Sequence, residues 1–203
     1  MWQADTTMAT PKASDVLGHV TLVTGPEEFL NERAVTAALR AVRHADEEAE
    51  LSETSADQLS MGALADLAAP SLFSAIRCVV VRGLENLPDE TYDGMLEYAA
   101  APAEDVGLVL VHSGGQKGSG LLAKLRKLSP VTEVKSAALK PSEYSRWVAA
   151  EARSHGARLA EDAADLLVQA VGQDLRALAG ACHQLANDFA GEPLTAEVVK
   201  RYF

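Results

Sequence analysis

Short apolar runs alternate with helical patterns along the first 140 residues, and this alternation restricts the fold more than any other feature of the sequence. The clearest runs are His19–Thr24, Arg77–Arg82 and Val106–His112, which are rich in Val and Leu and lack strict polar alternation. Strands have this appearance when helices cover both faces of a parallel sheet. The sequence therefore predicts an α/β domain built on a mostly parallel sheet.

Two weaker strand candidates, Glu50–Ser55 and Val131–Lys135, bring the expected sheet to five strands. Helical spacing fills the intervals between the apolar runs. The helices predicted there are Glu27–His44, Ser60–Ala69, Asp89–Ala100 and Gly120–Leu128.

The strand signal ends near Lys140, and the sequence that follows it is purely helical. Pro141 stands where a helix would begin. Further helices are predicted over Tyr144–His155, Glu161–Val171 and Asp174–Phe189, with a last short helix opening at Thr195. We expect an α/β domain at residues 19–140, a small helical domain at 141–203, and a polar, flexible leader over residues 1–18.

The chain is acidic, with a formal net charge of −11, and neither the part before Lys140 nor the part after it is basic. Direct binding to nucleic acid is therefore disfavoured. The sequence contains no run of about 20 apolar residues, so it predicts no membrane-spanning helix. Cys78 and Cys182 are far apart in sequence and are expected to be buried free thiols, as in a reducing cytoplasm. The five histidines show no metal-ligand spacing.

A strand–loop–helix segment begins at Gly25, in the setting where P-loop proteins hold a nucleotide. A working P-loop has Gly at its sixth place, then Lys for the phosphate charge, then Ser or Thr for magnesium. Those places hold Leu30, Asn31 and Glu32, and the acidic Glu27 and Glu28 precede them. The sequence predicts a degenerate loop that does not bind nucleotide.

A second glycine cluster, residues 113–120, follows the third clear strand. It contains Gly118-x-Gly120-x-x-Ala123, a loose match to the dinucleotide-binding fingerprint. We interpret the cluster as a flexible, solvated loop. The alternative is a loop that contacts a partner through Lys117.

An apolar pair, Leu72-Phe73, lies between a predicted helix and the strand at Arg77, directly after Pro70-Ser71. Pro breaks the preceding helix and Ser can cap a new short one. Such a pair can fill the core of its own domain. Alternatively it can insert into a partner's pocket, which would compensate for leaving a phenylalanine in water.

Four stretches in order carry a family resemblance: LVTGPEEFLNERAV, PSLFSAIRCVVVRG, VGLVLVHSGG and VGQDLRALAGACHQLA. The chain resembles the delta subunits of bacterial DNA polymerase III clamp loaders, in an actinobacterial-type version, from about His19 to Phe203. The resemblance implies an AAA+-like α/β domain with a five-stranded sheet and a degenerate P-loop, followed by a helical lid domain.

The resemblance also implies a role: to bind and open the sliding clamp (the beta subunit) during DNA replication without ATP hydrolysis by this chain. In that family a Leu-Phe pair on a short helix fills a hydrophobic pocket of the clamp, and the matching residues are Leu72 and Phe73, with Ser71 and Pro70 beside them. No catalytic residue, cofactor or metal is expected. DNA would be met only through the assembled DNA-directed DNA polymerase holoenzyme, in the cytoplasm, with no membrane partner.

The sequence departs from the family pattern in three ways. Pro70 replaces a larger apolar residue that often contributes to the clamp contact, and a Glu–Lys pair of the lid has no counterpart near residues 180–184. Family members also continue into a collar domain that joins the tau/gamma and delta prime subunits, and this chain ends about where that domain would begin. Two other functions stay open: a small nucleotide-dependent ATPase or kinase with a non-standard loop, and a non-catalytic adaptor.

Overall fold

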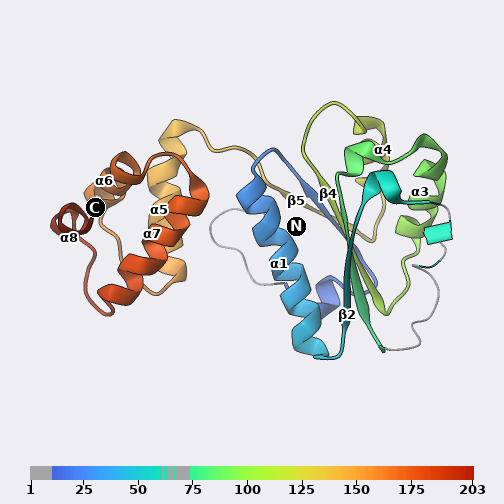
Figure 1. Cartoon of the computed structure of the whole chain (residues 1–203), viewed down its shortest axis with the longest axis horizontal. Helices are drawn as coiled ribbons and strands as arrows, with labels where there is room; N and C mark the ends of the chain where they lie inside the picture. Colours follow the sequence, from blue (N-terminus) through green and yellow to red (C-terminus); the bar gives the residue numbers. More distant parts are fainter. Residues whose placement is uncertain (1–10, 61, 64–65, 67–73) are drawn as a thin grey trace. The chain divides into compact units, whose positions relative to one another are not determined.

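The first compact unit of the protein is built on a five-stranded, fully parallel sheet (Figure 1). The computed structural model describes residues 11–60, 62–63, 66 and 74–203. The chain divides after Ala137 into two compact units. The strands are β1 (Val20–Thr24), β2 (Glu50–Ser55), β3 (Arg77–Arg82), β4 (Val106–His112) and β5 (Val131–Lys135), in the order β2-β3-β4-β1-β5. The predicted parallel α/β sheet is confirmed.

Strand β1 lies between β4 and β5 and pairs with both. Its last residue, Thr24, is opposite His112 of β4 and Lys135 of β5. Because the strands are parallel, the loops that follow β1, β4 and β5 meet at one edge of the sheet, the carboxyl edge. The residues that precede the strands lie together at the opposite, amino edge.

Helices cover both faces of the sheet, which explains the uninterrupted apolar strands. Helix α1 (Glu28–Ala45) packs against β1, β3 and β4 on one face. The other face is covered by α3 (Tyr92–Ala100) and α4 (Ser119–Leu125) (Figure 1). Helix α1 begins one residue later than predicted because Glu27 is its N-cap, with its carboxylate accepting a hydrogen bond from the Phe29 N–H at 3.4 Å.

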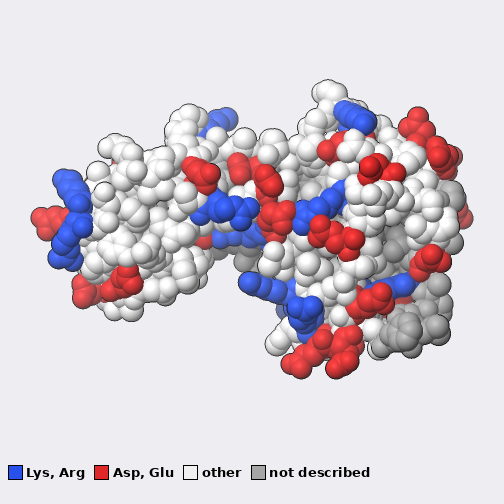
Figure 2. Space-filling view, viewed as in Figure 1, with Lys and Arg blue, Asp and Glu red and all other residues white. Residues whose placement is uncertain are grey.

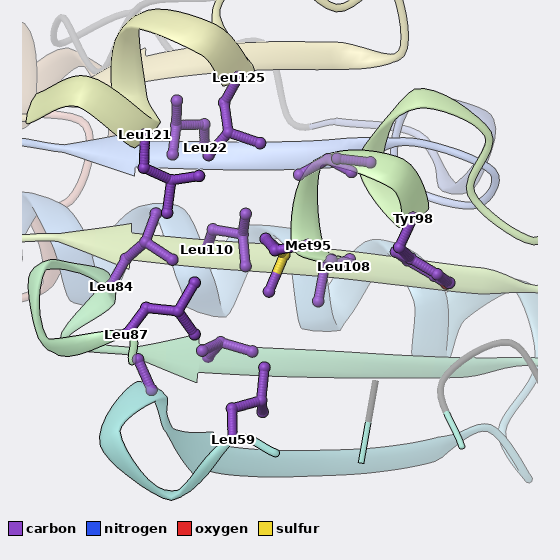
Figure 3. Close-up of a cluster of buried hydrophobic side chains, with 14 of the residues drawn as sticks. Leu22, Leu59, Leu84, Leu87, Met95, Tyr98, Leu108, Leu110, Leu121 and Leu125 are labelled. Atoms are coloured by element: carbon purple, nitrogen blue, oxygen red, sulfur yellow. The ribbon is translucent and has the colours of Figure 1, made fainter. Parts of the chain in front are cut away.

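The main hydrophobic cluster fills the space between the sheet and the α3–α4 side (Figure 3). Alternate residues of β1, β3 and β4 face it, and they meet side chains of α3, α4 and a short 3₁₀ helix, η3 (Leu84–Asn86). Its largest fully buried members are Leu22, Leu84, Met95, Leu108, Leu110, Leu121 and Leu125. Aliphatic and alanine side chains build this core, in keeping with the low aromatic content of the chain.

Residues 11–18 differ from the polar, flexible leader expected there. They form a 3₁₀ helix, η1 (Ala13–Asp15), and Val16 behind it is 1% exposed. The Gly18 N–H donates to the Val106 carbonyl at 3.0 Å. A side chain at Gly107 would lie 2.8 Å from Val16, so the glycine opens the space in which Val16 packs. This part of the chain belongs to the first unit.

The structure contains three further short 3₁₀ helices that the sequence patterns did not predict as separate elements. They are η2 (Ala56–Gln58), η4 (Asp89–Thr91) and η5 (Pro141–Glu143). Helix η4 occupies the first turn of the helix predicted from Asp89 to Ala100. Pro88 precedes it, and Thr91 donates its hydroxyl to the Pro88 carbonyl at 2.7 Å.

The second unit is helical throughout, apart from a bridge between Leu159 and Leu194. Its helices are α5 (Tyr144–Ser154), α6 (Glu161–Val171), α7 (Leu175–Asp188) and α8 (Ala196–Tyr202). Helix α5 packs against α6 and α7, and α6 packs against α8. Helices α7 and α8 begin where Asp174 and Thr195 cap them, with Asp174 accepting from the Ala177 N–H at 2.7 Å.

Both cysteines are buried free thiols, as predicted. Burial raises the pKa of the Cys78 thiol to about 12, so this side chain behaves as a core residue rather than a nucleophile. Across residues 11–60, 62–63, 66 and 74–203, no helix is both long and apolar enough to cross a membrane.

A polar cluster joins β1, β5 and the end of α4. The Glu133 carboxylate accepts hydrogen bonds from the Thr24 hydroxyl at 2.6 Å and from the Arg126 guanidinium at 2.6 and 3.1 Å. Partial burial raises the pKa of Glu133, but the hydrogen bonds from Arg126 and Thr24 outweigh that effect, so its pKa lies below its ordinary value.

Replacing Glu133 by Gln should lower the free energy of unfolding by about 1–2 kcal/mol at pH 7. A group whose pKa is depressed in the folded state stabilises the fold above its ordinary pKa, which is 4.5 for Glu133, and that contribution is lost as the pH falls through the folded-state pKa. Urea unfolding of both proteins should therefore show a difference that shrinks on acidification. Glu47→Gln, at an exposed carboxylate, should show little difference at any pH.

Candidate functional site

The loop after β1 approaches the end of β5 so closely that only glycine fits at its first position. Gly25 has a φ of 148°, and a Cβ there would lie 2.0 Å from the Ser136 carbonyl oxygen. In a P-loop, glycines allow the backbone to approach phosphate. Here the glycine allows it to approach another segment of the same chain.

Backbone amides of this loop are already engaged inside the protein. The Gly25 N–H donates to the His112 carbonyl at 3.0 Å, and the Glu27 N–H donates to the Ser136 carbonyl at 3.1 Å. The Phe29 N–H faces the Glu27 carboxylate. A phosphate would have to break these bonds and would meet the Glu27 charge, so the loop is a poor anion site.

The residues at the three diagnostic places of the loop have structural partners. Leu30 is 3% exposed and belongs to the core. Asn31 is 7% exposed, and its side-chain amide donates to the Gly25 carbonyl at 3.0 Å. The place of the phosphate-binding lysine is thus taken by a neutral side chain that closes the loop on itself.

Glu32 occupies the place of the magnesium-binding hydroxyl and pairs with Arg82 at the carboxyl end of β3. The guanidinium contacts the Glu32 carboxylate at 2.5 and 3.1 Å and the Glu53 carboxylate of β2 at 2.5 Å. Hydrogen bonds with Glu53 and then Glu32 raise the pKa of Arg82. P-loop enzymes place magnesium between an N-terminal helix hydroxyl and an acid on a neighbouring strand. In this protein a fixed guanidinium lies between two carboxylates instead.

Sequence reasoning identified Glu32 but missed its partner. Arg82 ends an apolar run, where a charged residue is typical of any strand end. Its significance depends on β3 lying near the start of α1, which is a property of strand order.

The glycine cluster after β4 is largely exposed, as expected of a solvated loop, and the buried His112 bonds to it at two points. His112 Nδ1 accepts from the Gly114 N–H at 2.9 Å, so Nε2 is the protonated nitrogen and donates to the Lys117 carbonyl at 2.8 Å. Gly114 has a φ of 87°, and a Cβ there would lie 3.0 Å from Gly25. The Lys117 ammonium donates to the Asn86 side chain at 2.7 Å.

Glu85 of η3 completes this arrangement by accepting from the Ser113 N–H at 3.2 Å. Burial raises the pKa of Glu85, but hydrogen bonds from Ser113 and from the backbone N–H of Glu85 itself outweigh it and lower the pKa below its ordinary value. The carboxylate therefore acts as a hydrogen-bond acceptor for the start of the loop.

A cavity of about 350 Å³ opens at the carboxyl edge between the loops after β1 and β4. Thr24, Gly115, Ser119 and Lys135 are among its lining residues. Arg126 also lines it, but its guanidinium is paired with Glu133. Within the described part of the chain, no three His, Cys, Asp or Glu side chains are grouped so as to hold a metal ion.

The predicted clamp-contact residues Pro70, Ser71, Leu72 and Phe73 lie outside the described residues, and the structure fixes positions on either side of them. Within the predicted helix from Ser60 to Ala69, residues 62, 63 and 66 are helical. Arg77, the first residue of β3, donates to the Asp66 carbonyl at 2.9 Å. The Ser74 hydroxyl donates to the Ile76 carbonyl at 2.7 Å. Both anchors lie at the amino edge of the sheet.

Around residues 180–184, where the sequence lacks the family's Glu–Lys pair, the side chains have neutral contacts. Gln184 of α7 donates its amide to the Tyr202 hydroxyl at 2.6 Å, and the Asn187 side chain contacts His183 at 3.0 Å. The Gln184 contact joins α7 to α8, whereas the Asn187–His183 contact lies within α7.

Gly25→Ala should destabilise the protein on the order of 3 kcal/mol in the absence of any nucleotide, because the added methyl group collides with the backbone of Ser136. Gly120→Ala is the matched control: it lies inside α4, and a Cβ there meets nothing within 4 Å. That variant should stabilise the protein by about 0.5–1 kcal/mol. Chemical denaturation measures both, and similar stabilities for the two variants would contradict this account of Gly25.

Titration with magnesium-ATP should give no saturable heat change at millimolar nucleotide, because the loop amides are engaged and Glu32 is paired with Arg82. The same titration of the Lys117→Ala variant tests whether the glycine cluster after β4 contributes to binding. Saturable binding by the native chain that is lost in this variant would show that the glycine cluster holds a nucleotide.

No protein-family model matches the sequence, and no curated protein matches it. Among solved structures, the chain is similar to the Bacillus subtilis DNA clamp loader delta protein (YqeN), with a TM-score of 0.76 and 18% identity over 91% of this chain and 58% of that one. The Thermotoga maritima RuvB Holliday junction branch migration motor matches with a TM-score of 0.47 and 16% identity, over 92% of this chain and 61% of that one. The chain thus spans less than two thirds of either structure. It has the parallel α/β fold with a following helical unit that the sequence predicted, and it shares this fold with the Bacillus clamp loader delta protein.

Proposed function

We propose that this chain is the clamp-binding part of a clamp-loader delta subunit, which binds and opens the sliding clamp of DNA polymerase III without hydrolysing ATP itself. The observation that carries the proposal is the fold shared with the Bacillus clamp loader delta protein over 91% of the chain. Four sequence stretches of the same family, in the same order, support it independently of the structure.

The degenerate phosphate loop supports a role without ATP chemistry. Its amides are bonded within the protein, its lysine place holds Asn31, and the Glu32–Arg82–Glu53 network occupies the expected region of the metal. In the assembled loader, nucleotide bound by other subunits would control when this chain reaches the clamp.

The proposed contact with the clamp is made by Leu72 and Phe73, with Pro70 and Ser71 beside them. The hydrogen bond from Arg77 to the Asp66 carbonyl fixes one side of this segment relative to β3. A fixed flank limits how far the segment can move from β3, which would lower the entropic cost of binding.

Opening of the clamp follows from differential affinity. A protein that binds the open or strained ring more tightly than the closed ring shifts the population towards the open form by the ratio of those affinities. No bond is made or broken by this chain. The energy comes from the contacts at Leu72 and Phe73 and from neighbouring surface on the same edge.

A delta subunit works within a larger assembly. The tau/gamma and delta prime subunits would be its neighbours through a collar domain, and DNA would be met through that assembly in the cytoplasm. The net charge of −11 agrees with indirect rather than direct contact with DNA.

Replacing both Leu72 and Phe73 by Ala should weaken binding to the sliding clamp of the same organism by roughly 30- to 700-fold, the equivalent of losing about 2–4 kcal/mol at a hot spot. Titration calorimetry measures the affinity. Release of clamps from circular DNA measures opening, and the double variant should lose this activity as well.

Phe203→Ala is the control for loss of an aromatic ring, because Phe203 is a large hydrophobic residue that is 50% exposed in the second unit. It should bind the clamp like the native chain. Native-like affinity of the Leu72/Phe73 variant would overturn the contact assignment, and failure of the native chain to bind any clamp would overturn the proposed function.

A further inference from the structure

A second surface at the amino edge has the features of a protein-binding groove. It lies between η1 and the last turns of α1, and its cavity volume is about 510 Å³, within the range of ligand-binding clefts. The apolar lining is made by Pro11, Ala13, Ala41 and Ala45. These small side chains leave room for one or two apolar side chains of a partner.

The rim of this groove is basic, although the chain as a whole is acidic. Lys12, Arg40 and His44 are its other lining residues, and all three are exposed. None of their side chains forms an ion pair or hydrogen bond with any described residue. The nearby Asp15 carboxylate is bonded to the Lys12 backbone N–H at 2.8 Å. In Figure 2, Lys and Arg side chains lie over this end of α1, beside a group of Asp and Glu side chains.

Helix electrostatics account for only part of this charge. Basic residues in the last turn of a helix stabilise its C-terminus, and in α1 these are Arg43 and His44. Arg40 lies before that turn, and Lys12 belongs to a different element. Their convergence on an apolar groove therefore calls for a different explanation, and a partner with complementary charge provides one.

The groove lies at the same edge of the sheet as the proposed clamp contact. Its two sides precede β1 and β2, and the segment containing Leu72 and Phe73 precedes β3. All five strands are parallel, so the described residues directly before β1, β2 and β3 share the amino edge. A partner bound at Leu72 and Phe73 would have its neighbouring surface directed towards this edge.

We propose that this basic groove binds an acidic segment of the sliding clamp, with apolar side chains inserted over Ala13 and Ala41 and carboxylates paired with Lys12 and Arg40. This inference rests on the proposed function and adds a second contact to it. The groove contact supplies orientation and electrostatic attraction, while the Leu-Phe contact supplies the main burial of apolar surface.

The test compares three variants in clamp-binding titrations. Lys12→Ala combined with Arg40→Ala should weaken binding about tenfold at low salt and less at high salt, because screening already weakens the lost ion pairs in the native complex. Ala45→Phe narrows the groove without changing charge and should also weaken binding. Arg43→Ala removes an exposed charge from the same helix outside the groove lining and should bind like the native chain.

Each outcome separates this inference from the proposed function. If the native chain binds the clamp through Leu72 and Phe73 but the Lys12/Arg40 variant behaves like Arg43→Ala, the groove contact is refuted and the proposed function stands. If the native chain alone forms a dimer in sedimentation experiments and the Lys12/Arg40 variant abolishes it, the occupant is a second copy and the inference is also refuted.

Discussion

The close contact between the end of β1 and the loops after β4 and β5 is the constraint on which the rest of the first unit depends. Gly25 lies against Ser136 on one side and Gly114 on the other, and its amide is bonded to the His112 carbonyl. This contact brings three strand ends into one packed edge and directs the chain into α1. The backbone amides that bind phosphate in P-loop proteins are hydrogen-bonded within this protein, so here the carboxyl edge holds the strand ends together.

The charged side chains at this edge are also paired within the protein. The Glu32 and Glu53 carboxylates carry like charges, and Arg82 lies between them and pairs with both. The three side chains come from α1, β3 and β2, so the ion-pair network ties the helix to the far strands of the sheet. At the start of α1 the ion-pair network thus occupies the region where a P-loop protein would hold magnesium.

Much of the fold could be predicted because burial on both faces leaves a strong local signal. The runs at β3 and β4 were predicted with their observed bounds, and the helical character after Pro141 was recognisable from spacing alone. The structure of residues 11–18 was harder to predict. Val16 lies in a mostly polar stretch, and its burial depends on the space that Gly107 leaves on a distant strand. The role of His112 in the glycine loop could not be predicted either, because its ring bonds to backbone groups that any residue carries.

The sequence by itself determined that this protein has a parallel α/β unit followed by a helical one, and that its phosphate loop lacks the lysine and hydroxyl a nucleotide requires. Those conclusions depend on residue type and local spacing, which the chain carries in any conformation. Tertiary structure alone decided that Arg82 pairs with Glu32, that Gly25 is required by Ser136, and that Lys12 and Arg40 converge on one groove. Each of these depends on strand order and helix packing, which bring together residues that lie far apart in the sequence.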